Sequence, residues 1–553
     1  MNVQRQSKLL SIIVGCGDEK GIVFIVALAL VAILALVGTV AVTTTTTDIK
    51  ISSNYKTNVQ AFYIAEAGIQ DGINRLLNGT IVDNAKTDPN WNSSSTYSSN
   101  GFNNSFTIMH KVVGSGTVVN DSNGNPLYII TSNGTTSSSK KTLETVLSLT
   151  ADSIFHDSLL GCDGVLATSS IDTDSYDSQI GSYASQTPGD NGNISTTNTG
   201  APITIASSSV IKGDANATGS LTMNSSAQVN GDVNATGNLT MNSSSNVLGN
   251  VNTAGSLSMI SSARIYQNAN ATGNITMSSS SRIDGNANTV GTITMSNSSK
   301  IFGNATAGGT VIINSGSSVS GTVTQYYTGY SGYGGVLTSD CDPLDTPTFF
   351  NDNVTPIASD NDNGELSPLY YNTFTQAFLL SSSSSYTLGV SGESKKYYCS
   401  SLSVASSSQL TVTGNVTMYV NGNFSFNSSS DFILASGAKL TAYVTGTISI
   451  GSSGKVNAAN DKKPANFFLW SSAISSNNSD YKITLTSSSD VYAAIHAPQA
   501  AINISSSVDL YGAVRGKYIN IASSADFHYD EALKNMSVGN PSSYEIVSWR
   551  EIN

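Results

Sequence analysis

Cysteine is the residue type in this chain that can take the largest number of chemical roles, because it can form disulfides, bind metals or act as a nucleophile. The 553 residues contain four cysteines: Cys16, Cys162, Cys341 and Cys399. They form no C-x-x-C pair and no histidines cluster with them, so the sequence indicates neither a metal site nor a cofactor. Cys341 and Cys399 flank the same linker, and we expect a disulfide between these two.

Ionisable residues gather near the C-terminus, where His528, Asp530 and Glu531 resemble an acid–base group. They follow the last predicted strand, however, and the polar closing cap of a repeat domain belongs at that place. Elsewhere the polar positions are mainly Thr, Ser and Asn, with few of the paired carboxylates that glycoside hydrolysis requires. We therefore expect a protein that is not an enzyme and has no catalytic residues.

A processing site is the remaining chemical signal. Asp18, Glu19, Lys20 and Gly21 stand directly before an apolar run, whereas a secretory signal carries its cleavage site after such a run. This order predicts cleavage between Gly21 and Ile22. Two alternatives stay open: an uncleaved signal anchor, and lipoprotein processing at Cys16, which follows the lipobox-like sequence Ile13 to Gly15.

The run from Ile22 to Val42 carries no charge, and as a helix it is about 31 Å long, which matches a hydrocarbon core of about 30 Å. The pattern then becomes amphipathic. One helical stripe has spacings of three and four residues and contains Phe62, Ala65, Ile69, Ile73 and Leu76. These elements predict a membrane helix that continues as a surface helix.

This segment resembles the class III leader and N-terminal helix of type IV pilins, and more closely the PilX-type N-terminus of minor pilins. The resemblance is carried by Glu19 to Gly21, the run from Ile22, and the sequence AFYIAEAGI at 61–69. It implies prepilin peptidase and other pilin-like subunits as partners, with the inner membrane as the first location and the cell surface as the second. Pilins usually carry a glutamate where this chain has Val26, so the resemblance points to a minor, tip-located subunit.

Residues 205–324 repeat with a period of 18. Met223, Met241, Met259 and Met277 share one register position. Within each repeat apolar and polar residues alternate strictly, and because 18 is even each position keeps its face from coil to coil. The pattern predicts a β-solenoid with apolar side chains inside and asparagines stacked in lines outside.

The fold is therefore expected to be mainly β, with a long N-terminal helix. We expect the following order: a leader at 1–21, the helix at 22–78, a small antiparallel sheet at 79–150, a connecting segment at 151–204, the regular solenoid at 205–324, a linker or cover at 325–400, a second solenoid with its cap at 401–533, and a tail at 534–553.

A structural subunit of a pilus or related filament, with a solenoid head that adheres or primes assembly, is the function that this organisation favours. The net charge of −12, without a basic cluster, argues against nucleic acid as a partner; a glycan or a protein remains as the surface ligand. Two other interpretations stay open: a membrane-anchored polysaccharide-active enzyme, because such enzymes often use β-helices, and a polymer similar to bactofilins, whose solenoid ends stack bare.

Overall fold

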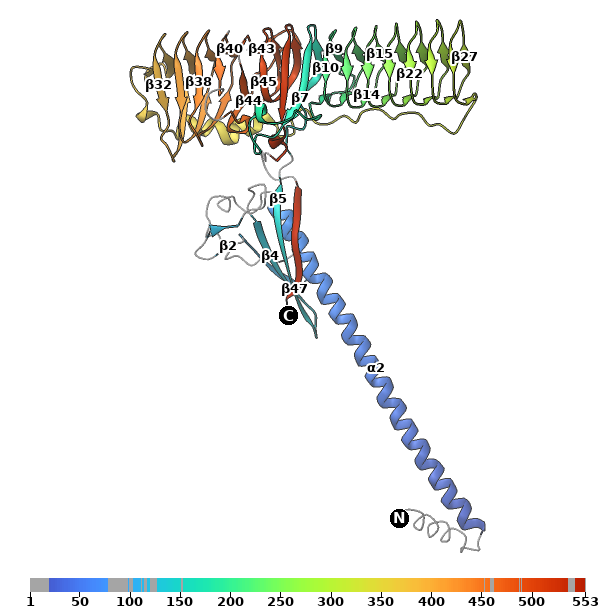
Figure 1. The fold of residues 1–553 in the computed structure, drawn as a ribbon. Helices are drawn as coiled ribbons and strands as arrows, with labels where there is room; N and C mark the ends of the chain where they lie inside the picture. Colours follow the sequence, from blue (N-terminus) through green and yellow to red (C-terminus); the bar gives the residue numbers. More distant parts are fainter. Residues whose placement is uncertain are drawn as a thin grey trace. The chain divides into compact units, whose positions relative to one another are not determined.

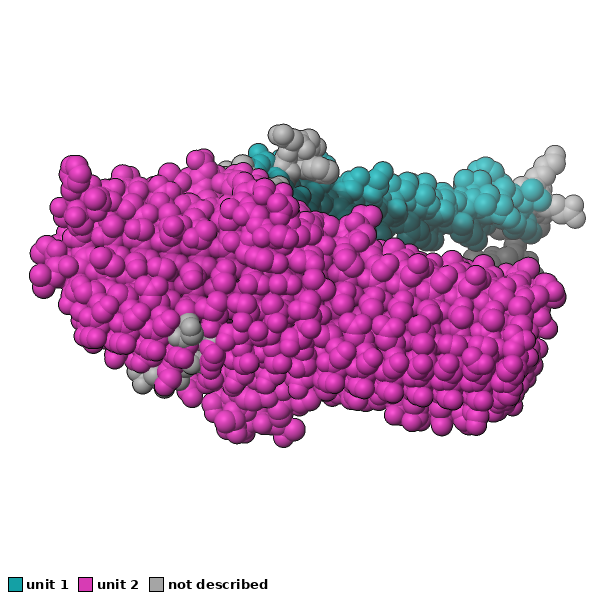
Figure 2. Space-filling view, turned by 90° about the horizontal axis from the view of Figure 1, so that it is seen from above, with its two compact units in different colours: residues 1–151, 540–553 teal, residues 152–539 magenta. Residues whose placement is uncertain are grey.

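The computed structural model divides into two compact units, residues 1–151 with 540–553 and residues 152–539 (Figure 2). The structure describes residues 19–77, 98, 103–110, 112–113, 117–119, 127–150, 153–451, 453–457, 462–486, 488, 490–535 and 543–552. Cys16 and its lipobox-like sequence lie outside these residues.

The first unit is a long helix whose C-terminal part packs against a small sheet (Figure 1). Helix α2 runs over Glu19–Leu77. The sheet has the order β1-β4-β5-β47, and every neighbouring pair is antiparallel. Its strands are β1 (Asn104–His110), β4 (Leu127–Thr135), β5 (Lys140–Thr150) and β47 (Ser543–Ile552), and a hairpin is formed by β2 (Val112–Val113) and β3 (Thr117–Val118). The expected tail thus supplies an edge strand.

The predicted helical stripe forms the core of this unit. Ala65, Ile69 and Ile73 are buried against Ile108, Ile130 and other apolar residues of the sheet. Gly134 of β4 lies so close to α2 that a Cβ there would stand 2.1 Å from the Ala61 carbonyl oxygen. The sequence from Ile22 to Val42 has no such cover, and its large apolar side chains are exposed around the whole helix.

The second unit is one β-solenoid rod built from two arms (Figure 1). The first arm opens with β6 (Leu159–Ala167), β7 (Ile171–Tyr176), helix η2 (Tyr183–Ser185), β8 (Ile194–Thr196) and β9 (Ile203–Ile205). Residues 159–204, which lie in the range expected to be a connecting segment (151–204), therefore belong to the first coils of the rod. Three columns of parallel strands continue from them.

The first column contains β11 (Ala215–Ala217), β14 (Val233–Ala235), β17 (Val251–Thr253), β20 (Ala269–Ala271), β23 (Ala287–Thr289), β26 (Ala305–Ala307) and β29 (Val323–Thr324). The second contains β12 (Leu221–Met223), β15 (Leu239–Met241), β18 (Leu257–Met259), β21 (Ile275–Met277), β24 (Ile293–Met295) and β27 (Val311–Ile313). The third contains β10 (Val210–Ile211), β13 (Gln228–Val229), β16 (Asn246–Val247), β19 (Arg264–Ile265), β22 (Arg282–Ile283), β25 (Lys300–Ile301) and β28 (Ser318–Val319).

The alternation explains why these coils stack. Leu221 pairs with Leu239 and Met223 with Met241, an offset of 18 residues, and all four side chains are fully buried. On the outer face, amide side chains hydrogen-bond from coil to coil at 2.8–3.0 Å, as predicted, through Asn216, Asn234, Asn252, Asn270 and Asn288. At one corner Gly249 packs on the previous coil, where a Cβ would meet the Gly231 carbonyl oxygen at 2.4 Å.

A strap, residues 325–345, leads back along the first arm. Tyr333 and Val336 each donate a backbone N–H to a threonine of that arm, Thr272 and Thr236 respectively. Short helices follow, namely α3 (Thr346–Phe349), η3 (Phe350–Val354), η4 (Thr355–Ala358) and η5 (Asn363–Glu365).

The second arm begins at residue 371, inside the range expected as a linker or cover. Its coils are longer: Phe378 pairs with Leu402 and Leu402 with Phe424, offsets of 24 and 22 residues. Its elements are β30 (Tyr371–Asn372), β31 (Ala377–Leu380), β32 (Ser385–Leu388), β33 (Ser394–Cys399), β34 (Ser401–Val404), β35 (Gln409–Val412), β36 (Asn415–Val420), β37 (Phe424–Phe426), β38 (Asp431–Leu434), β39 (Lys439–Val444), β40 (Ile448–Ile450), β41 (Lys455–Val456), η6 (Pro464–Asn466), β42 (Phe467–Ser471), β43 (Tyr481–Leu485), β44 (Val491–Ile504), β45 (Asp509–Ile521), β46 (Ala525–Asp530) and η7 (Glu531–Asn535).

The two arms meet at what we call the join, the stack of β45 and β46 on β6 and β7. β45 pairs in parallel with β6, and β46 pairs in parallel with β7. The second arm is therefore built inward from its far end and finishes beside the coil where the first arm begins. The sequence 527–533 closes no end of the rod, so the expected cap at the C-terminal end of a second solenoid is wrong.

Candidate functional sites

The predicted cleavage point, between Gly21 and Ile22, lies in the first turn of α2. Among the described residues, α2 is the one helix that is long and apolar enough to cross a membrane. Val26, at the position where pilins usually carry glutamate, is 57% exposed on this helix. Cleavage itself remains a prediction.

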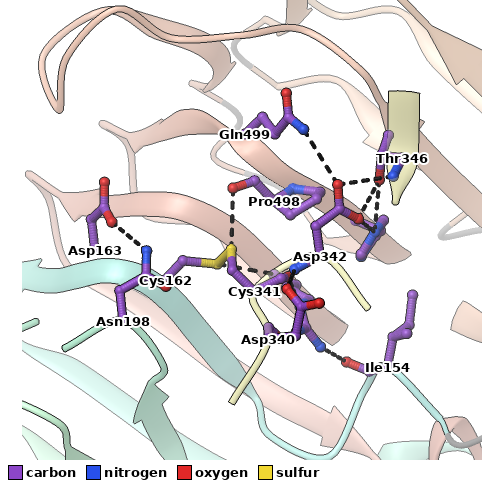
Figure 3. Close-up of a disulfide and its surroundings, with 12 residues drawn as sticks. Ile154, Cys162, Asp163, Asn198, Asp340, Cys341, Asp342, Thr346, Pro498 and Gln499 are labelled. Atoms are coloured by element: carbon purple, nitrogen blue, oxygen red, sulfur yellow. Dashed lines mark hydrogen bonds and ion pairs between the residues drawn. A yellow bond between two sulfur atoms is a disulfide. The ribbon is translucent and has the colours of Figure 1, made fainter. Parts of the chain in front are cut away.

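A disulfide joins Cys162 to Cys341 and fixes the strap at the join (Figure 3). The expected partner of Cys341, Cys399, is instead a free, buried residue at the end of β33. That prediction is wrong because β33 lies in the second arm, away from the join, whereas the strap brings Cys341 onto β6. Burial raises the pKa of the Cys399 thiol to about 12, so this side chain packs as an apolar group.

Arg515 of β45 holds the same stretch of chain. Its side chain is almost completely buried, and the guanidinium donates to three backbone carbonyl oxygens: Cys341 at 2.9 Å, Asp340 at 2.7 Å and Ile154 at 2.9 Å. A planar guanidinium with five N–H groups suits such a divergent set of acceptors. Arg515 therefore clamps the strap and the start of the second unit to the join.

His496 and Asp342 lie beside this clamp. His496 is fully buried against Trp470 and Phe155. Burial lowers its pKa, so the imidazole is neutral near pH 7. Burial opposes ionisation of Asp342, but the His496 imidazole, whose Nε2 lies 3.8 Å from the carboxylate, and the hydrogen bonds from Thr346 outweigh this effect and hold the pKa of the carboxyl below its ordinary value. These contacts dock the first turn of α3, which is a structural role.

His528, Asp530 and Glu531 do come together with other polar groups, but at the join. The Nδ1 atom of His528 lies 2.7 Å from a carboxylate oxygen of Asp174. Asp530 is fully buried and accepts hydrogen bonds from the backbone N–H and the hydroxyl of Ser178. Glu531 accepts from the Ser175 hydroxyl at 2.8 Å. Each group is thus committed to holding β7 and the loop after it.

An aromatic stack runs beside these residues on the outside of the rod. Tyr492 and Tyr511 are parallel, with ring centroids 4.1 Å apart, and His528 continues the column 4.5 Å further on. Tyr183 covers the stack and donates its hydroxyl to Asp174 at 2.7 Å. Because Tyr492 and Tyr511 are buried by this cover, the stack offers no open face to a ligand.

A row of aspartates lies next to the aromatic stack, and sequence reasoning missed it. Asp509 pairs in register with Asp526, and Asp526 pairs with Asp172. Asp490 occupies the equivalent place in the preceding coil, because the next residue, Val491, pairs with Leu510. Burial raises the pKa of Asp509, and the charge of Asp490 raises it further; burial and the charges of Asp509 and Asp172 act likewise on Asp526. Among the described residues, no group of three or more His, Cys, Asp and Glu is placed to hold a metal ion.

Comparison with known proteins gives matches at both ends of the chain. Residues 20–70 match the family described as PilX N-terminal. Residues 346–536 match a Domain of unknown function (DUF7305), and this match spans α3 to η7, the helical segment and the second arm. The chain matches no curated protein.

One solved structure, the competence-associated pilin ComZ from Thermus thermophilus, aligns with 10% sequence identity over 90% of this chain and 97% of its own. The TM-score of this alignment is 0.25.

Proposed function

We propose that this chain, a type IV minor pilin-like protein with a large C-terminal β-solenoid, is a structural subunit that carries the solenoid as a head at the cell surface. The observation that carries the proposal is the contrast between the two ends of α2. Near its C-terminal end, from Ala61 to Leu77, one side of the helix is buried by the small sheet, while the first half of the helix presents large apolar side chains on every side. Such a surface needs lipid or other helices around it.

The proposed mechanism is mechanical. The first half of α2 holds the precursor in the inner membrane until prepilin peptidase cuts between Gly21 and Ile22. The released helix then packs among the helices of other pilin-like subunits, where dispersion contacts replace those with lipid. The second unit moves outward with the filament.

The topology of the first unit suits this role. The second unit is inserted between β5 and β47, which are neighbours in the sheet. A large head can thus be inserted in the sequence between two paired strands while the helix and its sheet keep their packing. Adhesion to a glycan or protein, or priming of assembly, is the proposed task of this head.

A polysaccharide-active enzyme is the second candidate, and the aspartate row is the feature that favours it. The aromatic stack beside the row is covered, and within the row Asp172 accepts a hydrogen bond from the backbone N–H of Val210 at 3.0 Å. An acid–base pair needs free carboxylates facing a sugar-binding groove, so we favour the structural role. Sugar release from pectin, alginate or peptidoglycan by the purified chain would favour the enzyme instead.

Immunogold labelling with antibodies against the second unit tests the location. Val26 in place of glutamate supports a minor subunit at the filament tip, so we expect gold particles at filament ends. Label spread evenly along filaments would contradict the tip position, and label confined to the inner membrane in filament-forming cells would contradict the surface role.

A further inference from the structure

The far end of the first arm is open. Strands β27, β28 and β29 each pair with the preceding coil, and among the described residues no strand lies beyond them. Ile313 is 42% exposed and Val323 40%, whereas Met295 and Ala305, one coil earlier in the same columns, are fully buried. The apolar interior of the solenoid therefore reaches the surface at this end.

The last coil at this end has backbone N–H groups that would bond to a further coil if one were present. In the preceding coil the N–H of Ile293 donates to the Thr310 carbonyl of the next coil at 3.0 Å. The equivalent donor, the N–H of Val311, has no next coil and bonds to the side-chain oxygen of Gln325 at 3.1 Å. Tyr326 and Tyr327 beside it are 70% and 46% exposed. The end thus combines strand edges with an apolar rim.

The usual protection of exposed strand edges is missing from this end. Natural proteins block such edges with Lys, other charges, Pro or a covering element, and they close solenoids with polar surface. Residues 303–327 contain no Asp, Glu, Lys, Arg or Pro. An edge that lacks these devices pairs readily with another strand.

We propose that the open end of the first arm binds the same end of a second copy of this chain. Two such ends match in size because both are 18-residue coils, and neither carries a charge that would repel the other. The far end of the second arm is a poor partner, since its coils span 22–24 residues and the hairpin strand β30 already occupies the edge of β31. The contact is isologous, with the edge strands antiparallel across a twofold axis. It depends on the second unit alone and holds whether or not the chain enters a filament.

The test uses the full chain inserted into lipid nanodiscs at one copy per disc, with the mass of the particles measured over a range of concentrations. We expect pairs of discs for the wild type. Ile313→Lys places a charge at the open edge and raises the dissociation constant by about tenfold or more; Val323→Lys, on another strand, has the same effect. Thr276→Lys adds the same charge on the exposed outer face of β21 and leaves pairing unchanged.

Electron micrographs of the wild-type pairs locate the contact at the far end of the first arm. Single discs at every concentration would overturn the proposal, and would leave a strand from another protein as the occupant. Pairs joined at any other place, or pairs that persist in both lysine variants, would also overturn it. Equal melting temperatures of the wild type and the three variants, measured at a concentration too low for pairs to form, confirm that the variants are folded.

Discussion

At the residue scale, the join depends on side chains that are far apart in the sequence. Cys162 and Cys341 are separated by 179 positions, and Arg515 reaches Ile154, Asp340 and Cys341. Neither contact could be predicted from spacing, because both exist only once the strap has returned along the first arm. The sequence indicated a disulfide at Cys341, but proximity to a shared linker selected the wrong partner.

Replacing both cysteines of the disulfide, as Cys162→Ser with Cys341→Ser, should lower the free energy of unfolding of the second unit by about 2–5 kcal/mol. The bond closes a long loop, so its loss restores freedom to the unfolded chain. Denaturant unfolding followed by tryptophan fluorescence measures the change, because Trp470 is buried beside the join.

Cys399→Ala is the control, since it removes a free buried thiol and keeps the bond. Equal unfolding midpoints for the double serine variant and the wild type would show that the clamp of Arg515 holds the strap without the disulfide.

The aspartate row predicts a pH effect. Because the folded-state pKa of Asp509 is raised above its ordinary value, the fold favours the protonated form, and stability falls as pH rises from about 4 through the folded pKa. Asp509→Asn removes one charge of the row and should stabilise the fold near pH 7 by about 0.2–1 kcal/mol. At pH 3, where Asp509 is protonated in both states, the gain should vanish.

Melting temperatures at the two pH values test this, with Asp352→Asn as the control because Asp352 is exposed in η3, outside the row. A gain of the same size at both pH values would mean that the carboxyl charge is not the cause.

At the element scale, the periodic patterns in the sequence predicted helix α2 and the strands of the first arm. These patterns succeed because the same spacing decides which side chains of the element are buried. The stripe through Ile69 and Ile73 is the buried side of α2, and the period of 18 sets the register of the first arm. The pattern failed where coils lose their regular length. The segments that connect strands β6 to β9 differ in length, and the one between β7 and β8 contains η2. The sequence of these coils therefore shows no regular repeat. Strand β47 is not part of a repeating sequence pattern, and it joins the sheet only through its pairing with β5.

The close approach of β4 to α2 gives a prediction for the first unit. Gly134→Ala puts a Cβ against the backbone of α2, 2.1 Å from the Ala61 oxygen and 2.4 Å from the Ala65 nitrogen, so the sheet must shift. Overpacking of this kind costs about 1–3 kcal/mol. Hydrogen exchange of β4 and β5 amides should become faster.

Gly38→Ala is the matched control, because a Cβ on Gly38 meets nothing within 4 Å. Unchanged exchange in the Gly134→Ala variant would contradict the close packing of helix and sheet.

At the scale of the whole molecule, the chain forms one continuous solenoid from two arms that it builds in opposite orders. The first arm grows outward from the join, and the second is built from its far end back to it. The sequence indicates two solenoids separated by a break, and it correctly predicts a pilin-like helix with a mainly β remainder. Their union depends on the pairing of β45 with β6, a contact that no local pattern encodes.

Determining the N-terminus of the chain in material sheared from the cell surface tests the central claim most directly. If the chain is exported on a filament, its mature form should begin at Ile22, and a Gly21→Val variant, which blocks the predicted cut, should stay in the inner membrane. Sheared protein that keeps residues 1–21, or that begins with a lipid-modified Cys16, would contradict the account.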